Sequence, residues 1–308
     1  MIRSSLFMLA LAVLVVLQGT RRAAAATTYT FATLDDPLAA PGNTAAWGIS
    51  GNAIVGSFSD SNNTHGFTET SGVYTTLDVP GESSTEPRGI SDGAIVGRTF
   101  DGHSFHGFSF AAGVYTIQDI PGAYYTEARG VSGSSVVGIY YVHDGVRQSS
   151  TEHGYIEIGG NYTTLDAPNS IHTFATGIFG DTILGWFAGS TGEHGFRETD
   201  GVFTHVDFPG AHYTVPGGLY GNTLVGSYND GYGNHGFTET AGIYTTLDVP
   251  GAYETIASGI SGNTIVGYYS DNNGNTHGFV ATPVPESATL WLLGLGMAGL
   301  LAKVRRHP

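Results

Sequence analysis

Six histidines, each followed by glycine, are the residues whose type and spacing most readily suggest chemistry in this sequence. They are His65, His106, His153, His194, His235 and His277, with separations of 41, 47, 41, 41 and 42 residues. Imidazoles ligate metals and carry protons, but a fixed period in this range indicates a repeat architecture. A residue that every copy supplies is better explained as a packing or hydrogen-bonding part of the copy. The sequence shows no zinc-type histidine pair, nucleophile elbow, Walker loop or sialidase Asp-box pattern.

An aspartate and a threonine recur with the same period as the histidines, and each forms a column of equivalent positions in the six copies. The aspartates of an Asp-x-Pro motif are Asp35, Asp78, Asp119, Asp166, Asp207 and Asp248. A threonine follows each motif, at Thr44, Thr85, Thr126, Thr173, Thr214 and Thr255. Aspartate readily accepts hydrogen bonds from nearby backbone N–H groups in turns, so we predict that both columns form corner hydrogen bonds rather than a catalytic site.

Loops rich in oxygen ligands suggest a weak calcium site. Their aspartates are Asp60, Asp230 and Asp271, each followed by Asn, Ser or Gly. Carboxylate and amide oxygens suit Ca²⁺, but the closing Glu of an EF-hand and the nine-residue calcium repeat are both missing. We therefore prefer solvated turns, with Ca²⁺ as the weaker alternative, and predict no other cofactor.

Positions that vary from copy to copy are better candidates for ligand binding. One set lies directly before a recurring glycine and includes Trp47, Arg88 and Arg129. The second set lies in the longest links and consists of Tyr124, Tyr125, His172, His212, Tyr213 and Tyr253. Aromatic faces with polar neighbours suit sugar rings. The competing interpretation is that these rings only fill wide loops.

A carboxylate pair offers a different function. Glu86 and Glu127 occupy the same position in adjacent copies, and two acids facing one pocket are what a glycoside hydrolase needs. Arg88, Arg129 or His212 would complete such a site. Sequence does not give the separation of the carboxylates, so hydrolysis stays an alternative to binding.

The elements that must position these residues are short strands. In the best-preserved copy, Ile243–Ala281, we expect strands at Tyr244–Val249, Ala257–Ser261, Thr264–Tyr269 and His277–Ala281. Pairs such as Gly262-Asn263 and Ala241-Gly242 separate neighbouring strands, and tight hairpins select such pairs because their turns need positive φ. Three short links and one long link are what a four-stranded propeller blade requires.

The two ends of the repeat region predict how the ring closes. Repeat material begins with a lone strand, Phe31–Leu34, and ends with the first three strands of a sixth copy at His277–Ala281. Pairing these ends completes six blades and removes exposed sheet edges. We predict an all-β, six-bladed β-propeller of four-stranded blades, closed by the N-terminal strand. An open β-solenoid or a ring with a different blade count is the alternative.

Composition limits the partners of residues 27–282. This region contains all 26 acidic residues except Glu286, and five of the 11 basic ones, all of them Arg. Its charge near −20 opposes binding to nucleic acid and anionic lipid. The chain has no cysteine, so its stability must come from packing and ring closure.

The termini predict export. Residues 1–26 combine Arg3, the apolar run Leu6–Leu17 and small residues at Ala23–Ala26, as in a secretory signal peptide. The 12-residue run is short for a transmembrane span, which needs about 20 residues. Residues 283–308 contain Pro285-Glu286, an apolar run and a basic tail. This segment resembles the PEP-CTERM sorting signal of Gram-negative bacteria, although Ser287 replaces the second proline; an ordinary C-terminal anchor is the alternative.

The repeat itself resembles the extracellular HAF-type repeats often found with that signal, with His-Gly-Phe where the family has His-Ala-Phe. These resemblances imply cleavage by an exosortase, a cell-surface or extracellular location, and only transient membrane contact through the C-terminal segment. They imply no assigned chemistry. We expect a non-enzymatic protein that binds extracellular polysaccharide or acts as a scaffold. A hydrolase with a site at the axial channel and a purely structural surface-layer component are the alternatives.

Overall fold

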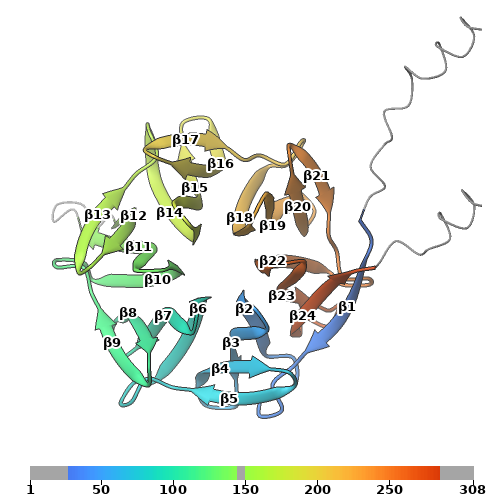
Figure 1. Ribbon diagram of the computed structural model, residues 1–308, viewed down its shortest axis with the longest axis horizontal. Coiled ribbons are helices and arrows are strands. Elements are labelled where there is room, and N and C mark those ends of the chain that lie inside the picture. The colour runs from blue at the N-terminus through green and yellow to red at the C-terminus, as the bar shows by residue number, and fades with distance from the viewer. Residues whose placement is uncertain (1–26, 144–149, 285–308) are drawn as a thin grey trace, which may run out of the picture.

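The computed structural model describes residues 27–143 and 150–284. The predicted signal peptide and the sorting motif Pro285-Glu286 lie outside the described residues. The described part forms six four-stranded antiparallel sheets arranged around an axis, as Figure 1 shows. The fold is therefore the predicted six-bladed β-propeller.

Each blade runs from an inner strand at the axis to an outer strand at the rim. The inner strands are β2 (Thr44–Ser50), β6 (Ser84–Ser91), β10 (Tyr125–Ser132), β14 (Ser170–Phe179), β18 (Tyr213–Tyr220) and β22 (Glu254–Ser261). The second strands are β3 (Ala53–Ser59), β7 (Ala94–Phe100), β11 (Ser135–His143), β15 (Thr182–Gly189), β19 (Thr223–Asn229) and β23 (Thr264–Ser270).

The outer half of each blade follows in chain order. The third strands are β4 (Thr64–Thr70), β8 (Phe105–Ala111), β12 (Ser150–Ile158), β16 (Gly192–Thr199), β20 (Asn234–Thr240) and β24 (Thr276–Pro283). The outermost strands are β5 (Val73–Leu77), β9 (Val114–Gln118), β13 (Asn161–Leu165), β17 (Val202–His205), β21 (Ile243–Thr246) and β1 (Tyr29–Leu34). We number the blades 1 to 6 by their inner strands, from β2 to β22.

The N-terminal strand completes blade 6, as predicted. β1 pairs antiparallel with β24, with Tyr29 opposite Pro283 and Leu34 opposite Gly278. The ring also closes at the axis, where the inner strands approach so closely that a side chain on the recurring glycine would meet backbone. A Cβ on Gly259 would lie 3.3 Å from the Cα of Gly48 across the seam, and one on Gly130 would lie 2.9 Å from the Cα of Gly177.

Tight turns and buried rings hold each blade together. Both residues of hairpins such as Asp92-Gly93 and Ser71-Gly72 have positive φ, as the turn pairs predicted. One aromatic ring from each third strand is fully buried: Phe67, Phe108, Tyr155, Phe196, Phe237 and Phe279. In blade 1 this ring fits against Gly56, where a Cβ would lie 2.4 Å from the Phe67 Cζ atom. Close packing of this kind stabilises the blades without disulfides.

The predicted corner hydrogen bonds are present. The Thr85 hydroxyl accepts a hydrogen bond from the Val79 N–H at 2.9 Å, and the five other corner threonines make the equivalent contact. Each recurring histidine lies 2.8–2.9 Å, through Nδ1, from the aspartate of the Asp-x-Pro motif in its blade. In blade 1, Asp78 also accepts the Gly66 N–H. These columns tie the third strand of each blade to the corner after the outermost strand.

Candidate functional site

A β-bulge aims one residue of each inner strand into the channel. The register shifts by one residue immediately before the recurring glycine in all six blades. A bulge leaves its extra residue without a partner in the ladder and redirects its side chain. The residues at the bulges are Trp47, Arg88, Arg129, Thr176, Gly217 and Ser258. The residues that differ from copy to copy in the sequence are therefore the ones whose positions face the channel.

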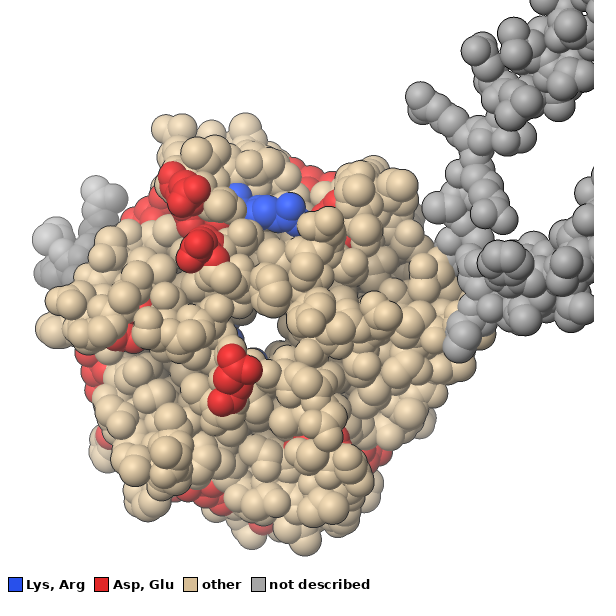
Figure 2. Space-filling view, viewed as in Figure 1, with Lys and Arg blue, Asp and Glu red and all other residues tan. Residues whose placement is uncertain are grey.

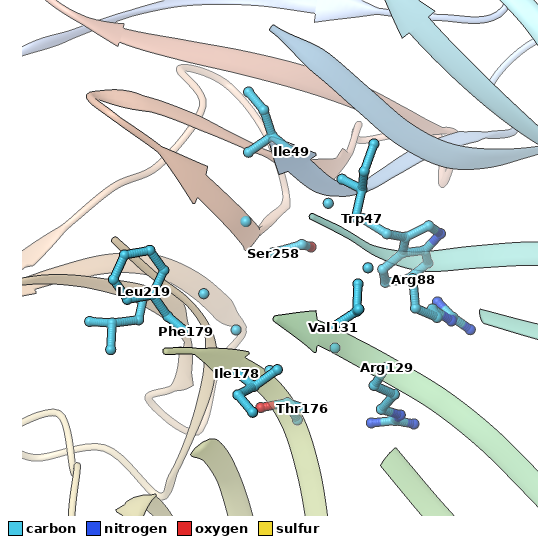
Figure 3. A pocket seen from close by; sticks show the side chains of 18 of the residues that line it. Trp47, Ile49, Arg88, Arg129, Val131, Thr176, Ile178, Phe179, Leu219 and Ser258 are labelled. Carbon is cyan, nitrogen blue, oxygen red and sulfur yellow. The ribbon is translucent and has the colours of Figure 1, made fainter. Parts of the chain in front are cut away.

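The channel around these residues is an open cavity of about 920 Å³. Figure 2 shows that the ring stays open at its centre. Two residues beyond five of the six bulges, apolar side chains form a second layer of the lining, from Ile49, Ile90, Val131, Ile178 and Leu219. Figure 3 labels four of them, Ile49, Val131, Ile178 and Leu219. Trp47 and Arg88 lie side by side, with the guanidinium 3.9 Å from the centre of the indole ring. The channel thus combines polar groups on one side with an apolar layer.

Three arginines and two glutamates form an ionic cluster between blades 2 and 3. Arg98 Nε donates to Glu86 Oε1 at 3.0 Å, and Arg98 Nη2 donates to Glu86 Oε2 at 3.1 Å. Arg88 Nη2 also donates to Glu86, at 2.9 Å. Arg88 Nε and Arg129 Nε each lie 3.1 Å from Glu127 Oε1, but neither N–H is aligned for a hydrogen bond. Those two contacts are therefore ion pairs rather than hydrogen bonds.

Glu127 is ionised at the centre of this cluster. Its side chain is 0% exposed, and its Oε2 accepts a hydrogen bond of 2.5 Å from the Tyr125 hydroxyl. Burial alone would raise the pKa of this carboxyl, but the charges of Arg129, Arg88 and Arg98 outweigh burial and lower the pKa to about 2. Burial also raises the pKa of Tyr125, with the Glu127 charge as the next cause. Tyr125 is therefore a neutral hydrogen-bond donor.

The structure brings four of the predicted ligand-binding residues to the channel wall. Trp47, Arg88, Arg129 and Tyr213 line it. Tyr125 belongs to the ionic cluster and stacks on Tyr141 with ring centres 4.3 Å apart. Tyr124 also contacts Tyr141, at 6.1 Å between ring centres. His172 lies apart from them, 2.7 Å from Glu152 Oε2 through Nδ1.

His212, Tyr213 and Tyr253 gather around the link between β19 and β20. His212 packs against Gly231, where a Cβ would lie 2.7 Å from the His212 ring, and the Tyr253 carbonyl lies beside Gly233. The Tyr213 hydroxyl donates to Asn234 Oδ1 at 2.7 Å, and Asn234 Nδ2 donates to Glu254 at 3.0 Å. These hydrogen bonds connect the loop surface of blades 5 and 6 to the channel wall.

The same link carries a residue that sequence analysis missed. Tyr232 is 92% exposed, and Tyr253 on the neighbouring link is 62% exposed. We call the group of Tyr232, Tyr253, His212 and Tyr213 the aromatic platform. The signal for Tyr232 was present, because this is the only second-to-third-strand link in the described part of the chain that contains a tyrosine.

The aspartates considered as calcium ligands accept hydrogen bonds from N–H groups of their own loops. Asp60 Oδ1 accepts the N–H groups of Asn62 and Asn63, and Asp230 Oδ1 accepts those of Tyr232 and Gly233. Asp271 accepts the N–H groups of two asparagines, and its pKa is lowered to about 2 by hydrogen bonds, first of all from the Asn275 backbone. None of the three belongs to a described cluster of three ligating side chains. The calcium site stays a prediction.

The predicted carboxylate pair does not share an open pocket. Glu127 lines the channel, whereas Glu86 is not among the lining residues, and each carboxylate is held by arginines. Conversely, the structure brings together a histidine pair that the sequence did not reveal, His194 and His205 with Asp207 in blade 4.

Within residues 27–143 and 150–284, no helix is long and apolar enough to span a membrane.

Comparison with known proteins identifies the fold but no family. No family model and no curated protein matches the sequence. The β-propeller domain of the Trilobed protease from Pyrococcus furiosus is similar at 7% identity and a TM-score of 0.51, over 78% of this chain and 94% of that domain. A putative TolB from Agrobacterium tumefaciens is similar at 12% identity and a TM-score of 0.53, over 79% and 90% of the two chains.

A third structure shows the same architecture within a larger protein. The Pyrococcus horikoshii acylaminoacyl peptidase matches at 10% identity and a TM-score of 0.51, over 79% of this chain and 46% of the peptidase. This chain therefore spans less than half of that enzyme. At such identities the likeness concerns the propeller fold alone.

Proposed function

We propose that this protein is an exported, non-enzymatic propeller that binds extracellular polysaccharide through the aromatic platform of blades 5 and 6. The observation that carries the proposal is the exposure of Tyr232 and Tyr253 on neighbouring links. Tyrosine has an apolar ring face and a polar hydroxyl, and the C–H faces of sugars pack well on such rings. The platform therefore suits a carbohydrate chain lying across the surface.

The polar groups around the platform support recognition of sugar hydroxyls. Tyr213, Asn234 and Glu254 are already joined by hydrogen bonds in the free protein, so little ordering is required on binding. Asp230 and Glu254 add negative charge beside the rings. A neutral glycan consequently meets less repulsion here than one rich in uronate or sulfate.

The ionic cluster favours binding over hydrolysis. A glycosidase needs one carboxyl with a raised pKa to protonate the leaving group. Glu127 has the opposite property, because the arginines outweigh burial and lower its pKa to about 2. Glu127 is therefore unsuited to act as this acid, while a scaffolding role without any glycan remains the third candidate.

Export and sorting by an exosortase are part of the proposal and rest on residues 1–26 and 283–308 of the sequence. The pairing of Tyr29 with Pro283 supports it, because both terminal segments leave the propeller at the same point of blade 6. Removal of residues 1–26 together with cleavage near Pro285-Glu286 would leave every described blade strand intact, because β24 ends at Pro283. Intact-mass measurement on protein from the native host tests this; recovery of a mature species that still carries Trp291 and Arg306 would contradict sorting.

A glycan-array screen of the full chain, with and without Ca²⁺, tests the binding proposal. We expect retention of at least one extracellular glycan, and loss of that retention in Tyr232→Ala and Tyr253→Ala. Tyr220→Ala is the matched control, because Tyr220 is an exposed tyrosine at the opposite end of inner strand β18.

The outcomes of this screen separate the candidate sites and the candidate functions. Loss of binding in Tyr220→Ala alone would move the site to the other mouth of the channel. Products released from a retained glycan would establish hydrolysis instead. If no glycan is retained, the scaffolding role replaces the binding proposal.

A further inference from the structure

Blade 4 contains a cluster of three potential metal ligands that is not found among the described residues of the other blades. His194 on β16 and His205 at the end of β17 both face Asp207, which follows β17. The Nδ1 atoms of His194 and His205 lie 2.9 and 3.4 Å from Asp207 Oδ2. One donor atom from each residue lies within 4.8 Å of the other two, and no other group of three His, Asp or Glu side chains in the described residues does so.

The cluster is a departure from the repeat rather than part of it. The sheet register places His205 opposite Phe196, and the residues in the corresponding place are Thr33, Thr76, Ile117, Thr164 and Thr246. The five other blades therefore have the histidine–aspartate pair without a second imidazole. Blade 4 alone gains a donor at a position where four blades carry threonine.

The link before β16 also changes. In blades 1, 2 and 5 a loop aspartate lies 3.5–3.6 Å from Nε2 of the recurring histidine. In blade 4 that neighbour is the Thr191 hydroxyl, 3.2 Å from His194 Nε2. A hydroxyl can accept the Nε2–H, so that Nδ1 can exchange its hydrogen bond with Asp207 for a bond to a metal. Such an outer hydrogen bond usually orients a ligating histidine.

From these features we infer that His194, His205 and Asp207 bind one divalent transition-metal ion of the Zn²⁺ class. Two imidazoles and a carboxylate suit Zn²⁺, Ni²⁺ or Cu²⁺ better than Ca²⁺ or Mg²⁺. With metal–ligand bonds of about 2.0–2.1 Å, tetrahedral ligands lie roughly 3.3 Å apart, close to the two separations around Asp207. Three protein ligands leave the fourth position for water or a partner group.

The surroundings fit an accessible site with one closed side. The Phe187 ring lies 5.6 Å from the His194 ring and 5.5 Å from the His205 ring, between centres, and covers the inner side. His205 is 58% exposed at the side chain, so an ion reaches the cluster directly from solvent. The His194–Asp207 contact is shared with every blade and is therefore already in place before any ion binds.

Equilibrium dialysis of the untagged full chain against Zn²⁺ and Co²⁺, with metal analysis of the protein, tests the inference. We expect one ion per chain, a Co²⁺ absorption spectrum typical of nitrogen and oxygen ligands, and loss of both in His205→Thr. That variant carries the residue present in four other blades, so it should fold, and its melting temperature without metal serves as the check.

A gain-of-function variant provides the matched control. Blade 1 has the same inner wall, since Phe58 stacks on His65 with ring centres 5.2 Å apart. Thr76→His places a second imidazole beside His65 and Asp78, and we expect it to raise the stoichiometry from one ion to two. Absence of bound ion in the wild type, retention of the ion by His205→Thr, or no second ion in Thr76→His would overturn the inference.

Discussion

Arg88 Nε and Glu127 Oε1 lie 3.1 Å apart although the two residues belong to the inner strands of different blades. This contact joins blade 2 to blade 3 beside the channel, close to where the backbones of Gly89 and Gly130 approach each other. Glu127 also contacts Arg98 and Arg129, so one fully buried carboxylate neutralises guanidinium groups from two blades. Its removal should therefore affect stability as well as the channel.

Replacement of this carboxylate should destabilise the ring. We expect Glu127→Gln to lower the free energy of unfolding by about 3 kcal/mol, because it leaves buried arginines with one carboxylate instead of two. Urea titration followed by tryptophan fluorescence measures the change. Glu193→Gln, at an exposed position of β16, is the control, and equal stability of the two variants would contradict the assigned role of Glu127.

The same residue predicts a dependence on pH. The pKa of Glu127 is about 2 in the folded protein, against an ordinary value of 4.5. The folded state thus favours the ionised form, so the stabilisation is fully present above pH 4.5 and is lost as the pH falls toward 2. We expect the stability difference between wild type and Glu127→Gln to shrink over this window. A difference that is constant from pH 6 to pH 2.5 would show that the carboxylate titrates normally.

The protein should be less stable with Tyr155 than with phenylalanine, which the five other blades carry at this position. The Tyr155 ring is fully buried in blade 3, and its hydroxyl has no hydrogen-bond partner. Burial of an unpaired hydroxyl costs free energy, so Tyr155→Phe should stabilise the protein by about 1 kcal/mol. The reverse change Phe67→Tyr, in blade 1, should destabilise it. Thermal unfolding of both variants checks the pair, and opposite signs are required.

Deletion of the first strand should open the ring. β1 contributes six residue pairs to β24 and packs Phe31 against Phe279, with ring centres 5.7 Å apart. We expect a chain without residues 29–34 to lose on the order of 5 kcal/mol and to self-associate through the exposed edge of β24. Sedimentation velocity and thermal unfolding measure both effects. Thr30→Ala is the control, since it keeps the backbone pairing; a monomeric deletion variant of normal stability would disprove the closure role.

Sequence was sufficient for the architecture because each blade repeats its own turn signals. Gly-Asn and Ala-Gly pairs located the hairpins, and the unmatched strand at Phe31–Leu34 predicted the closure. Strand ends were less accurate. β22 begins at Glu254 rather than Ala257, since the buried Thr255 belongs to it, and β21 ends at Thr246 rather than Val249, since Asp248 turns toward His235.

The candidate site was only partly predictable. Variation at Trp47, Arg88 and Arg129 marked the channel column, but the bulge that aims it inward is a feature of strand register. Arg98 lies in a second strand with no unusual neighbours in sequence, and only the packing of blades 2 and 3 brings it to Glu86 and Glu127. Likewise, His205 is 11 residues from His194, and the intervening hairpin places the two rings 4.9 Å apart.

The pairing of Tyr29 with Pro283 has a consequence for the order of the chain. Adjacent ends and near-equivalent blades mean that the architecture does not depend on where the polypeptide starts. A short linker between these two residues, with a new break in an exposed hairpin such as Gly221-Asn222, would give a circular permutant that keeps every inner strand and the channel. In such a permutant a different blade would be completed by strands from the two ends of the chain. Ring closure therefore depends on the pairing of the two chain ends within one blade and not on the particular sequence of β1.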